Sequence, residues 1–184
     1  MNQRQDLLVW MDLEMTSLVD VRVDTITEIA VVITDNDLTI VSEGPDIVIH
    51  ADPKRFDDIP ADVRAIHDKS GIIPEVLKST VTHGEAEKAV LDFVKEHVSP
   101  QSSPLCGSSM HMDRMFLYTY MPDLYNYLHH RNIDVSTIKE LARRTRPELY
   151  AEAEKLNEHK KHRALDDIKA SIAELKFYRD NWLK

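Results

Sequence analysis

Two apolar runs near the N-terminus constrain the fold more than any other feature of the sequence. Residues 7–13 are rich in Leu, Val and Trp, and residues 26–34 form the β-branched run ITEIAVVIT. Runs of this length and composition are typical of buried strands. Residues 35–37 (DND) predict a turn, so residues 38–42 are expected to return as a hairpin, followed by a short strand at 47–50. The sheet is therefore predicted to begin as an antiparallel meander.

The rest of the chain alternates between helical and strand patterns. Apolar residues recur at helical spacing, most clearly in residues 85–98, and Ser136 is placed to cap a later helix. The predicted elements are helices at 85–98, 113–121, 122–129, 136–144 and from 164 onward, strands at 104–108 and 133–135, and a loop or mobile helix pair at 146–161. Strands first and then alternating helices and strands predict an α/β fold, with a mixed central sheet flanked by helices.

The composition predicts one domain outside the membrane. The chain has 184 residues, 42% of them hydrophobic, and no Pro/Gly/Ser-rich stretch divides it. The segment MNQRQDLLVW holds only a brief apolar run, so neither a signal peptide nor a membrane span is expected. The single cysteine, Cys106, cannot form an internal disulfide and is expected to be buried, which fits a reducing compartment. We therefore expect a cytoplasmic protein with a single domain over residues 1–184.

The charge is unevenly distributed along the chain. A net charge of -9 argues against a protein that coats long nucleic acid, because such binding requires many lysines and arginines. Residues 1–122 hold 21 acidic and 10 basic side chains, whereas residues 123–184 hold 11 and 13. An acidic part suited to metal ions is thus joined to a part that could receive a short anion, although arginines on a helix can equally be ordinary solvated residues.

Asp12 and Glu14 form an acidic pair where the first apolar run ends. Side chains two apart on a strand share a face, so both carboxylates emerge side by side. Such a pair after strongly apolar residues is costly unless it is solvated or holds a cation, and the spacing alone leaves both interpretations open.

Three further residues are candidates for the same site. Asp113 opens a predicted helix, where an acid can bind a metal or simply be a favourable charge at the helix N-terminus. His162 and Asp167 are five residues apart, about 140° around a helix, so they reach one site only if His162 lies on the loop before the helix. A loop suits a base that approaches a water molecule, while Asp167 stays fixed as a ligand.

The donor types point to hard cations. Acidic oxygens without a Cys/His quartet favour Mg²⁺ or Mn²⁺ over structural zinc. Two such ions about 4 Å apart stabilise the attacking and leaving oxygens of an in-line displacement, which is the chemistry of phosphodiester hydrolysis.

Four segments, in this order and spacing, resemble the oligoribonucleases of the DEDDh group of 3′-to-5′ exonucleases: WMDLEMTSL, CGSSMHMDRMFL, IDVSTIKELARR and HRALDDI. The resemblance covers nearly the whole chain and implies an RNase H-like fold, a homodimer, and hydrolysis of short single-stranded RNA, down to dinucleotides, to nucleoside 5′-monophosphates. It also implies that His162 is the general base. The ligands of two divalent cations, Mg²⁺ or Mn²⁺, are then Asp12, Glu14, Asp113 and Asp167.

The resemblance also implies substrate contacts. Leu18 matches a leucine that wedges between the two bases, and His67 matches a histidine near the substrate. The group that caps the 5′-phosphate is Ser109, Arg131, Ser136 and Thr137. An arginine and hydroxyls are the donors that a phosphate end requires, and gripping one end would limit substrate length.

Several positions depart from the family pattern. Ser17 replaces a glycine, Ser108 an asparagine, and His130 a tyrosine that reaches across the dimer into the neighbouring site. His130 can still donate to a phosphate oxygen, or be an ordinary surface residue. The tryptophan usual upstream of HDKSG is missing. These changes touch substrate packing and leave the five catalytic positions intact.

The sequence therefore predicts a metal-dependent 3′-to-5′ exoribonuclease. One alternative is a related exonuclease acting on DNA 3′ ends, against which the 5′-phosphate cap argues. The other is a non-catalytic nucleotide-binding protein, against which the retained cluster of self-repelling carboxylates argues.

Overall fold

The computed structural model describes residues 6–157 and 162–183. The elements, in chain order, are β1 (Leu8–Met15), β2 (Ile26–Thr34), β3 (Ile40–Val48), the 3₁₀ turn η1 (Pro53–Phe56), α1 (Ala61–Ser70), α2 (Ile72–Lys78), α3 (His83–His97), β4 (Leu105–Gly107), α4 (Met110–Tyr120), α5 (Pro122–Tyr127), β5 (Asn132–Asp134), α6 (Val135–Thr145), α7 (Pro147–Glu154), the 3₁₀ turn η2 (Lys155–Asn157) and α8 (Ala164–Asn181). In this part of the chain no helix is both long and apolar enough to cross a membrane.

The five strands form one mixed sheet in the order β3-β2-β1-β4-β5. Strands β1, β2 and β3 are antiparallel neighbours, whereas β4 and β5 run parallel to β1. β2 is buried along its whole length, because it lies inside the sheet and both of its faces are covered. The predicted meander and the mixed α/β sheet are therefore confirmed.

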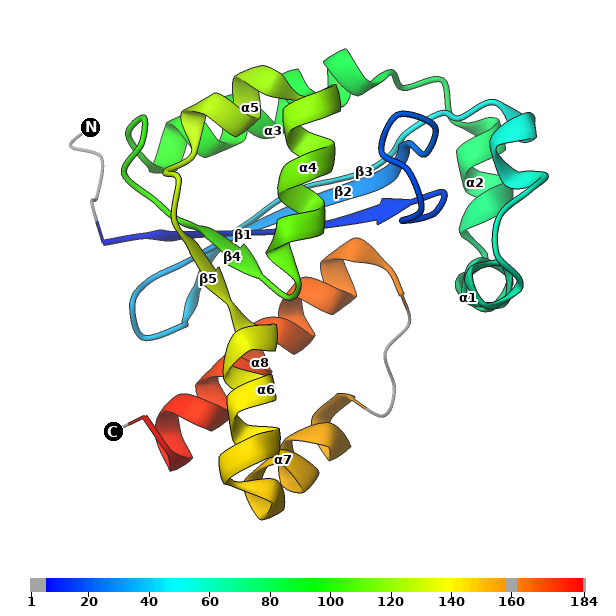
Figure 1. The fold of residues 1–184 in the computed structure, drawn as a ribbon. Coiled ribbons are helices and arrows are strands. Elements are labelled where there is room, and N and C mark those ends of the chain that lie inside the picture. Colours follow the sequence, from blue (N-terminus) through cyan, green and yellow to red (C-terminus); the bar gives the residue numbers. More distant parts are fainter. Residues whose placement is uncertain (1–5, 158–161, 184) are drawn as a thin grey trace.

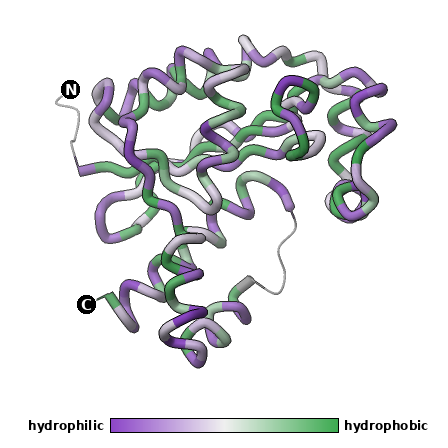
Figure 2. The backbone as a smooth tube through the Cα atoms, viewed as in Figure 1, coloured by the Kyte–Doolittle hydropathy of each residue, from purple (hydrophilic) through white to green (hydrophobic). Residues whose placement is uncertain are grey.

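Helices cover both faces of the sheet (Figure 1). Helices α3, α4 and α5 lie over one face, and α8 covers the other, with α6 and α7 packed against it. Val9 and Met11 of β1 belong to the first of these apolar layers, whereas Trp10 packs with Ile168 of α8 in the second. In Figure 2 the hydrophobic colour runs along the central strands, while the helices alternate between the two colours. The alternation along β1 sends its next even-numbered residues, Asp12 and Glu14, to the face that α8 covers.

The predicted strands at 38–42 and 47–50 are wrong as separate elements. They are parts of the single strand β3, which Gly44 and Pro45 do not interrupt. Register shifts in the pairing with β2 accommodate this stretch. Gly44 lies so close to Phe93 of α3 that a Cβ here would overlap its ring. The glycine is therefore needed for close packing of α3 and does not mark the end of a strand.

Several predicted helix boundaries are also corrected. The helix predicted at 85–98 is α3, which spans His83–His97. α4 begins at Met110, three residues before the predicted start at Asp113. α6 is capped by Asp134, whose side chain accepts from the main-chain N–H of Ser136, so the predicted cap at Ser136 is wrong. The helix predicted at 122–129 ends at Tyr127. In the predicted loop or helix pair at 146–161, residues 147–154 form α7, and residues 158–161 lie outside the described residues.

Candidate metal and substrate site

Three acidic side chains converge where β1 meets the start of α8. Oxygen atoms of Asp12, Glu14 and Asp167 all lie within 4.8 Å of one another. The first two come from the C-terminal end of β1 and share its face, while Asp167 lies in the first turn of α8. Carboxylate oxygens at such spacing are the ligand set that hard divalent cations take. The sequence-predicted site is therefore brought together for these three acids.

Asp113 lies beside this group and is not part of the 4.8 Å set. It is buried in the first turn of α4, and its Oδ1 accepts from the main-chain N–H of Leu13, at 3.0 Å. This bond joins α4 to β1 between the two strand acids. Asp113 is thus held next to the cluster, and its charge acts on Glu14.

The site disfavours negative charge when no cation is bound. Burial is the largest effect on Glu14 and raises its pKa to about 8, and the charges of neighbouring acids, Asp167 first, add to the rise. Arg163 acts in the opposite direction. Burial likewise raises the pKa of Asp113 to about 7. Carboxyl groups that hold protons near neutral pH, and that would lose them to a bound cation, fit the donor chemistry of a divalent metal site.

His162 lies on the loop before α8, two residues ahead of the helix. Its φ of 53° is in the left-handed region, which a non-glycine residue adopts only when its surroundings hold it there. The prediction that His162 stands off the helix while Asp167 stands on it is confirmed. Its role as general base stays a prediction.

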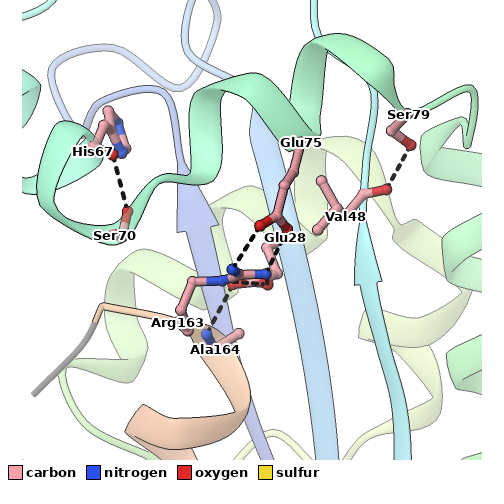
Figure 3. A network of polar contacts seen from close by, with 8 residues as sticks. All are labelled: Glu28, Val48, His67, Ser70, Glu75, Ser79, Arg163 and Ala164. Carbon is pink, nitrogen blue, oxygen red and sulfur yellow. Dashed lines mark hydrogen bonds and ion pairs between the residues drawn. The ribbon is translucent and has the colours of Figure 1, made fainter.

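The ion pairs of Arg163 with Glu28 and Glu75, here called the clamp, lie next to this histidine and were not predicted from the sequence. Arg163 lies between the buried Glu28 of β2 and Glu75 of α2, and it bonds both (Figure 3). The signal was a lone acid inside the apolar run ITEIAVVIT, because a buried carboxylate there requires a partner.

Three of the four residues predicted to cap a 5′-phosphate line one cavity of about 360 Å³. Ser109, Ser136 and Thr137 lie on its wall, and the hydroxyl oxygens of Ser109 and Ser136 are 3.1 Å apart. Arg131 is exposed and does not line this cavity, whereas Arg144 of α6 does. The structure therefore gathers the hydroxyls and places a different arginine on their wall.

Asp134 organises this cavity and was not predicted from the sequence. Its carboxylate accepts from the main-chain N–H groups of Ser109, Met110 and Ser136, at 2.9 to 3.0 Å. It thereby ties the start of α4 to the start of α6. The signal was an acid directly before a helix that carries serine and threonine in its first turn.

The remaining predicted substrate residues lie at different depths. Leu18 is 55% exposed on the loop after β1, as a wedge requires. His67 is buried in α1, where its Nε2 lies 3.1 Å from the main-chain oxygen of Thr16 and so supports that loop from behind. His130 is exposed, with its ring against His129. Their substrate roles stay predictions.

Two of the residues that depart from the family pattern make hydrogen bonds. The hydroxyl of Ser17 donates to the carboxylate of the buried Asp24 at 2.9 Å. The same carboxylate also accepts from the main-chain N–H groups of Val19 and Asp20. The hydroxyl of Ser108 lies 2.9 Å from that of Ser171 on α8. The first bond braces the loop that carries Leu18, and the second joins the entrance of α4 to α8.

Similar sequences span the whole chain. It is 46% identical over 184 residues to the oligoribonuclease of Bordetella pertussis, which covers 100% of this chain and 99% of that protein. It is 49% identical over 177 residues to the oligoribonuclease of Halorhodospira halophila, which covers 96% and 94% of the two chains. The chain belongs to the oligoribonuclease family. The RNase T exonuclease family profile matches residues 9–175, so the family predicted from the motifs is confirmed over almost the whole chain.

The fold of this chain is shared with more distant exonucleases. A zinc-bound complex of E. coli exonuclease I with single-stranded DNA matches with a TM-score of 0.72 at 16% identity, covering 98% of this chain and 42% of that one. Pop2p of S. pombe, with Mg²⁺ and Mn²⁺ bound, matches with a TM-score of 0.72 at 15% identity, covering 96% and 84%. This chain thus spans less than half of exonuclease I. At these identities the likeness concerns the fold, and it confirms the predicted RNase H-like exonuclease fold.

Proposed function

We propose that this protein is a 3′-to-5′ exoribonuclease that hydrolyses short single-stranded RNA, down to dinucleotides, to nucleoside 5′-monophosphates. The observation that carries the proposal is the convergence of Asp12, Glu14 and Asp167 in a chain of the oligoribonuclease family. A cytoplasmic location, as expected from the lone buried cysteine, is part of the same proposal.

In this proposal the acidic cluster holds two divalent cations, Mg²⁺ or Mn²⁺. Asp12, Glu14 and Asp167 supply the converging oxygens, and Asp113 completes the set from the start of α4. When bound, the cations would supply charge stabilisation to the attacking and leaving oxygens of the displacement. The protein side chains fix where the scissile phosphate lies, because β1, α4 and α8 hold the acids rigidly.

His162 takes the proton in the proposed reaction. A ring nitrogen of its imidazole accepts a proton from the attacking water. Its position on a loop allows the ring to approach the water without moving Asp167.

The cavity at the start of α6 receives the other end of the substrate. Its hydroxyls from Ser109, Ser136 and Thr137, with Arg144 on the same wall and Arg131 near by in sequence, suit a terminal phosphate. A protein that binds one phosphate end needs few basic groups, so the net charge of -9 is compatible with an RNA substrate. A cap at the 5′ end also favours the shortest substrates, because a longer chain would have to pass it.

Removing two hydroxyls from this cavity should weaken binding of 5′-phosphorylated substrates. In a Ser136→Ala, Thr137→Val variant, each lost bond to a charged phosphate raises KM by roughly tenfold. Steady-state kinetics on dinucleotides with and without a 5′-phosphate measures this effect. The unphosphorylated dinucleotide should be hardly affected, and Thr145→Val, which removes a hydroxyl bonded to Leu141 near the other end of α6, serves as the control. Equal losses on both substrates would contradict a phosphate cap.

We also propose that the protein is a homodimer, as the family resemblance implies. An apolar hollow of about 480 Å³ lies along α4, lined by Val21, Met115, Tyr118 and Tyr125 with His111, Arg114 and Thr119. Tyr118 is 67% exposed and Met115 43% exposed in this hollow, and a contiguous apolar patch of this kind is typical of a protein–protein interface. Arg114 donates to the main-chain oxygen of His129, so His130, predicted to act across the dimer, lies at the edge of the hollow.

Tyr118→Glu should therefore dissociate the dimer. A charge at the centre of an apolar contact weakens association by about 100-fold or more, whereas Tyr118→Phe retains the ring and should retain the dimer. Sedimentation velocity across a concentration series measures the change. A wild-type association constant for Tyr118→Glu would move the interface elsewhere on the molecule.

The proposed activity is tested by following the products from a short RNA labelled at its 5′ end. A 3′-to-5′ exonuclease shortens the labelled strand one nucleotide at a time, and chelator stops the reaction. Release of a labelled mononucleotide at the outset would indicate the opposite polarity, and internal fragments would indicate an endonuclease.

A further inference from the structure

A fifth carboxylate, that of Glu28, lies beside the acidic cluster but is hydrogen-bonded to other groups of the protein. Glu28 of β2 is the cross-strand partner of Glu14 of β1, and directly paired residues of two antiparallel strands project from the same face. Glu28 is fully buried. A buried acid at this position would add a fifth negative charge to the cluster unless other groups of the protein neutralised it.

Arg163 pairs with this acid through a fork of hydrogen bonds. Its Nε and Nη2 donate to Oε1 of Glu28 at 2.9 and 2.6 Å, and the main-chain N–H of Ala164 donates to Oε2 at 2.9 Å (Figure 3). Both oxygens of Glu28 are therefore engaged. Glu28 is therefore paired with groups of the protein and does not belong to the group of converging carboxylates that Asp12, Glu14 and Asp167 form.

The outer side of the same guanidinium is held by Glu75 of α2. Nη2 of Arg163 donates to Oε2 of Glu75 at 2.9 Å, and Nη1 to Oε1 at 3.2 Å. Figure 3 shows the guanidinium between the two carboxylates, where α8 begins. Bidentate bonds of this kind fix an arginine in direction as well as in place.

The clamp holds Arg163, the residue that connects His162 to the start of α8. The main-chain oxygen of Arg163 accepts the N–H of Asp167, so the residue that the clamp holds also closes the first turn of the helix. Beyond this turn α8 is held by apolar packing of Ile168 and Ile172. His162, with its left-handed φ, directly precedes Arg163, which carries the hydrogen bonds to Glu28 and Glu75.

We infer that Arg163, held between Glu28 and Glu75, is a positioning residue that fixes His162 over the acidic cluster in the conformation needed for proton transfer. The inference rests on the proposed function of this site. According to this inference, the ion pairs of Arg163 position His162, whereas the metal ligands are positioned by the packing of the elements that carry them.

Conservative variants are needed to test the clamp, because Arg163→Ala would leave Glu28 buried and uncompensated and could prevent folding. Arg163→Lys keeps the positive charge but replaces the fork with a single point donor that cannot bond both acids in the same way. Glu75→Gln weakens only the solvent-facing side. The matched control is Glu43→Gln, because Glu43 and Lys169 form an exposed ion pair at 2.9 Å that also ties α8 to the sheet, away from the site.

For Arg163→Lys we expect kcat to fall by about tenfold and for Glu75→Gln by about threefold, with KM and the Kd for Mn²⁺ within about twofold of wild type. Exchange of the Asp167 amide hydrogen should speed up by at least about tenfold in Arg163→Lys. Glu43→Gln should match wild type in all four measurements. Kinetics, titration calorimetry with Mn²⁺ and hydrogen exchange supply the readouts, all at a temperature far below unfolding.

A double-mutant comparison separates positioning from a structural role. If the clamp acts through the base, Arg163→Lys causes no further loss of kcat in a His162→Asn background. An equal tenfold loss in both backgrounds, a wild-type kcat for Arg163→Lys, or a loss of Mn²⁺ affinity that parallels the loss of kcat would each overturn the inference. An inactive wild-type protein would instead contradict the proposed function, and unchanged exchange at Asp167 would then still count against the clamp.

Discussion

Replacing Glu14 with glutamine should abolish metal-dependent hydrolysis and, at the same time, stabilise the metal-free protein. Loss of one ligand oxygen from the convergent set removes charge stabilisation of several kcal/mol, so the rate should fall by about 10³-fold or more. The increase in stability has a separate cause. The folded protein buries this carboxylate among other acids, and glutamine carries no charge to bury.

The direction of the stability effect follows from the pKa of Glu14, which is 4.5 when unperturbed and about 8 in the folded protein. Below pH 4.5 the group is protonated in both the folded and the unfolded chain, so it costs nothing. As the pH rises toward 8 the unfolded chain loses the proton first, and the folded state is progressively disfavoured. At pH 7.5 Glu14→Gln should therefore raise the free energy of unfolding by about 4 kcal/mol, or Tm by roughly 10 °C, and the gain should vanish near pH 4.

Thermal unfolding with chelator at both pH values, together with a Mn²⁺ titration, measures these effects. Wild-type Tm should rise with Mn²⁺ by linkage, and the variant should lose most of that rise. Glu96→Gln, an exposed acid on α3, is the control for a change of one charge. A lower Tm for Glu14→Gln in chelator would show that the carboxylate stabilises the fold, contrary to a site built to hold cations.

Replacing His162 with asparagine should leave folding and metal binding intact and remove most of the activity. Asparagine tolerates the left-handed φ of 53° better than alanine does, so the imidazole is lost without strain in the loop. Loss of a general base costs roughly 10² to 10⁴-fold in kcat. The Kd for Mn²⁺ should stay within about twofold, because the acids proposed as ligands lie on β1, α4 and α8 and not on the loop that carries His162.

Added imidazole provides a sharper check on this role. A small base that enters the vacated space should restore part of kcat in His162→Asn and should not affect wild type. Activity of the variant at the wild-type rate would exclude His162 as the base. A parallel loss of Mn²⁺ affinity would instead place the ring among the metal ligands.

Local sequence patterns were enough to predict the features that depend on short-range geometry. The alternation of a strand placed Asp12 and Glu14 on one face, and the turn angle of a helix placed His162 on a loop and Asp167 on α8. Both arrangements are observed. The ordered family motifs supplied Asp113 and the hydroxyls around the cavity, which no spacing rule links to β1.

Features that depend on distant contacts were not predictable in this way. β3 continues through Gly44 because α3 packs against it, and α6 is capped by Asp134 because that acid also serves the start of α4. The pairing of Glu28 with Arg163 joins residues 135 apart in the sequence. Each is a contact between elements whose relative positions cannot be read from local patterns in the sequence. The single domain over residues 1–184 stays a prediction.

The most direct test of the account compares turnover of a 5′-phosphorylated RNA dinucleotide, a longer RNA and single-stranded DNA, each with Mg²⁺, Mn²⁺ or chelator. The account predicts the highest kcat/KM on the dinucleotide, lower values on the longer RNA and on DNA, and no turnover in chelator. Equal or faster turnover of long DNA, or turnover in chelator, would contradict it.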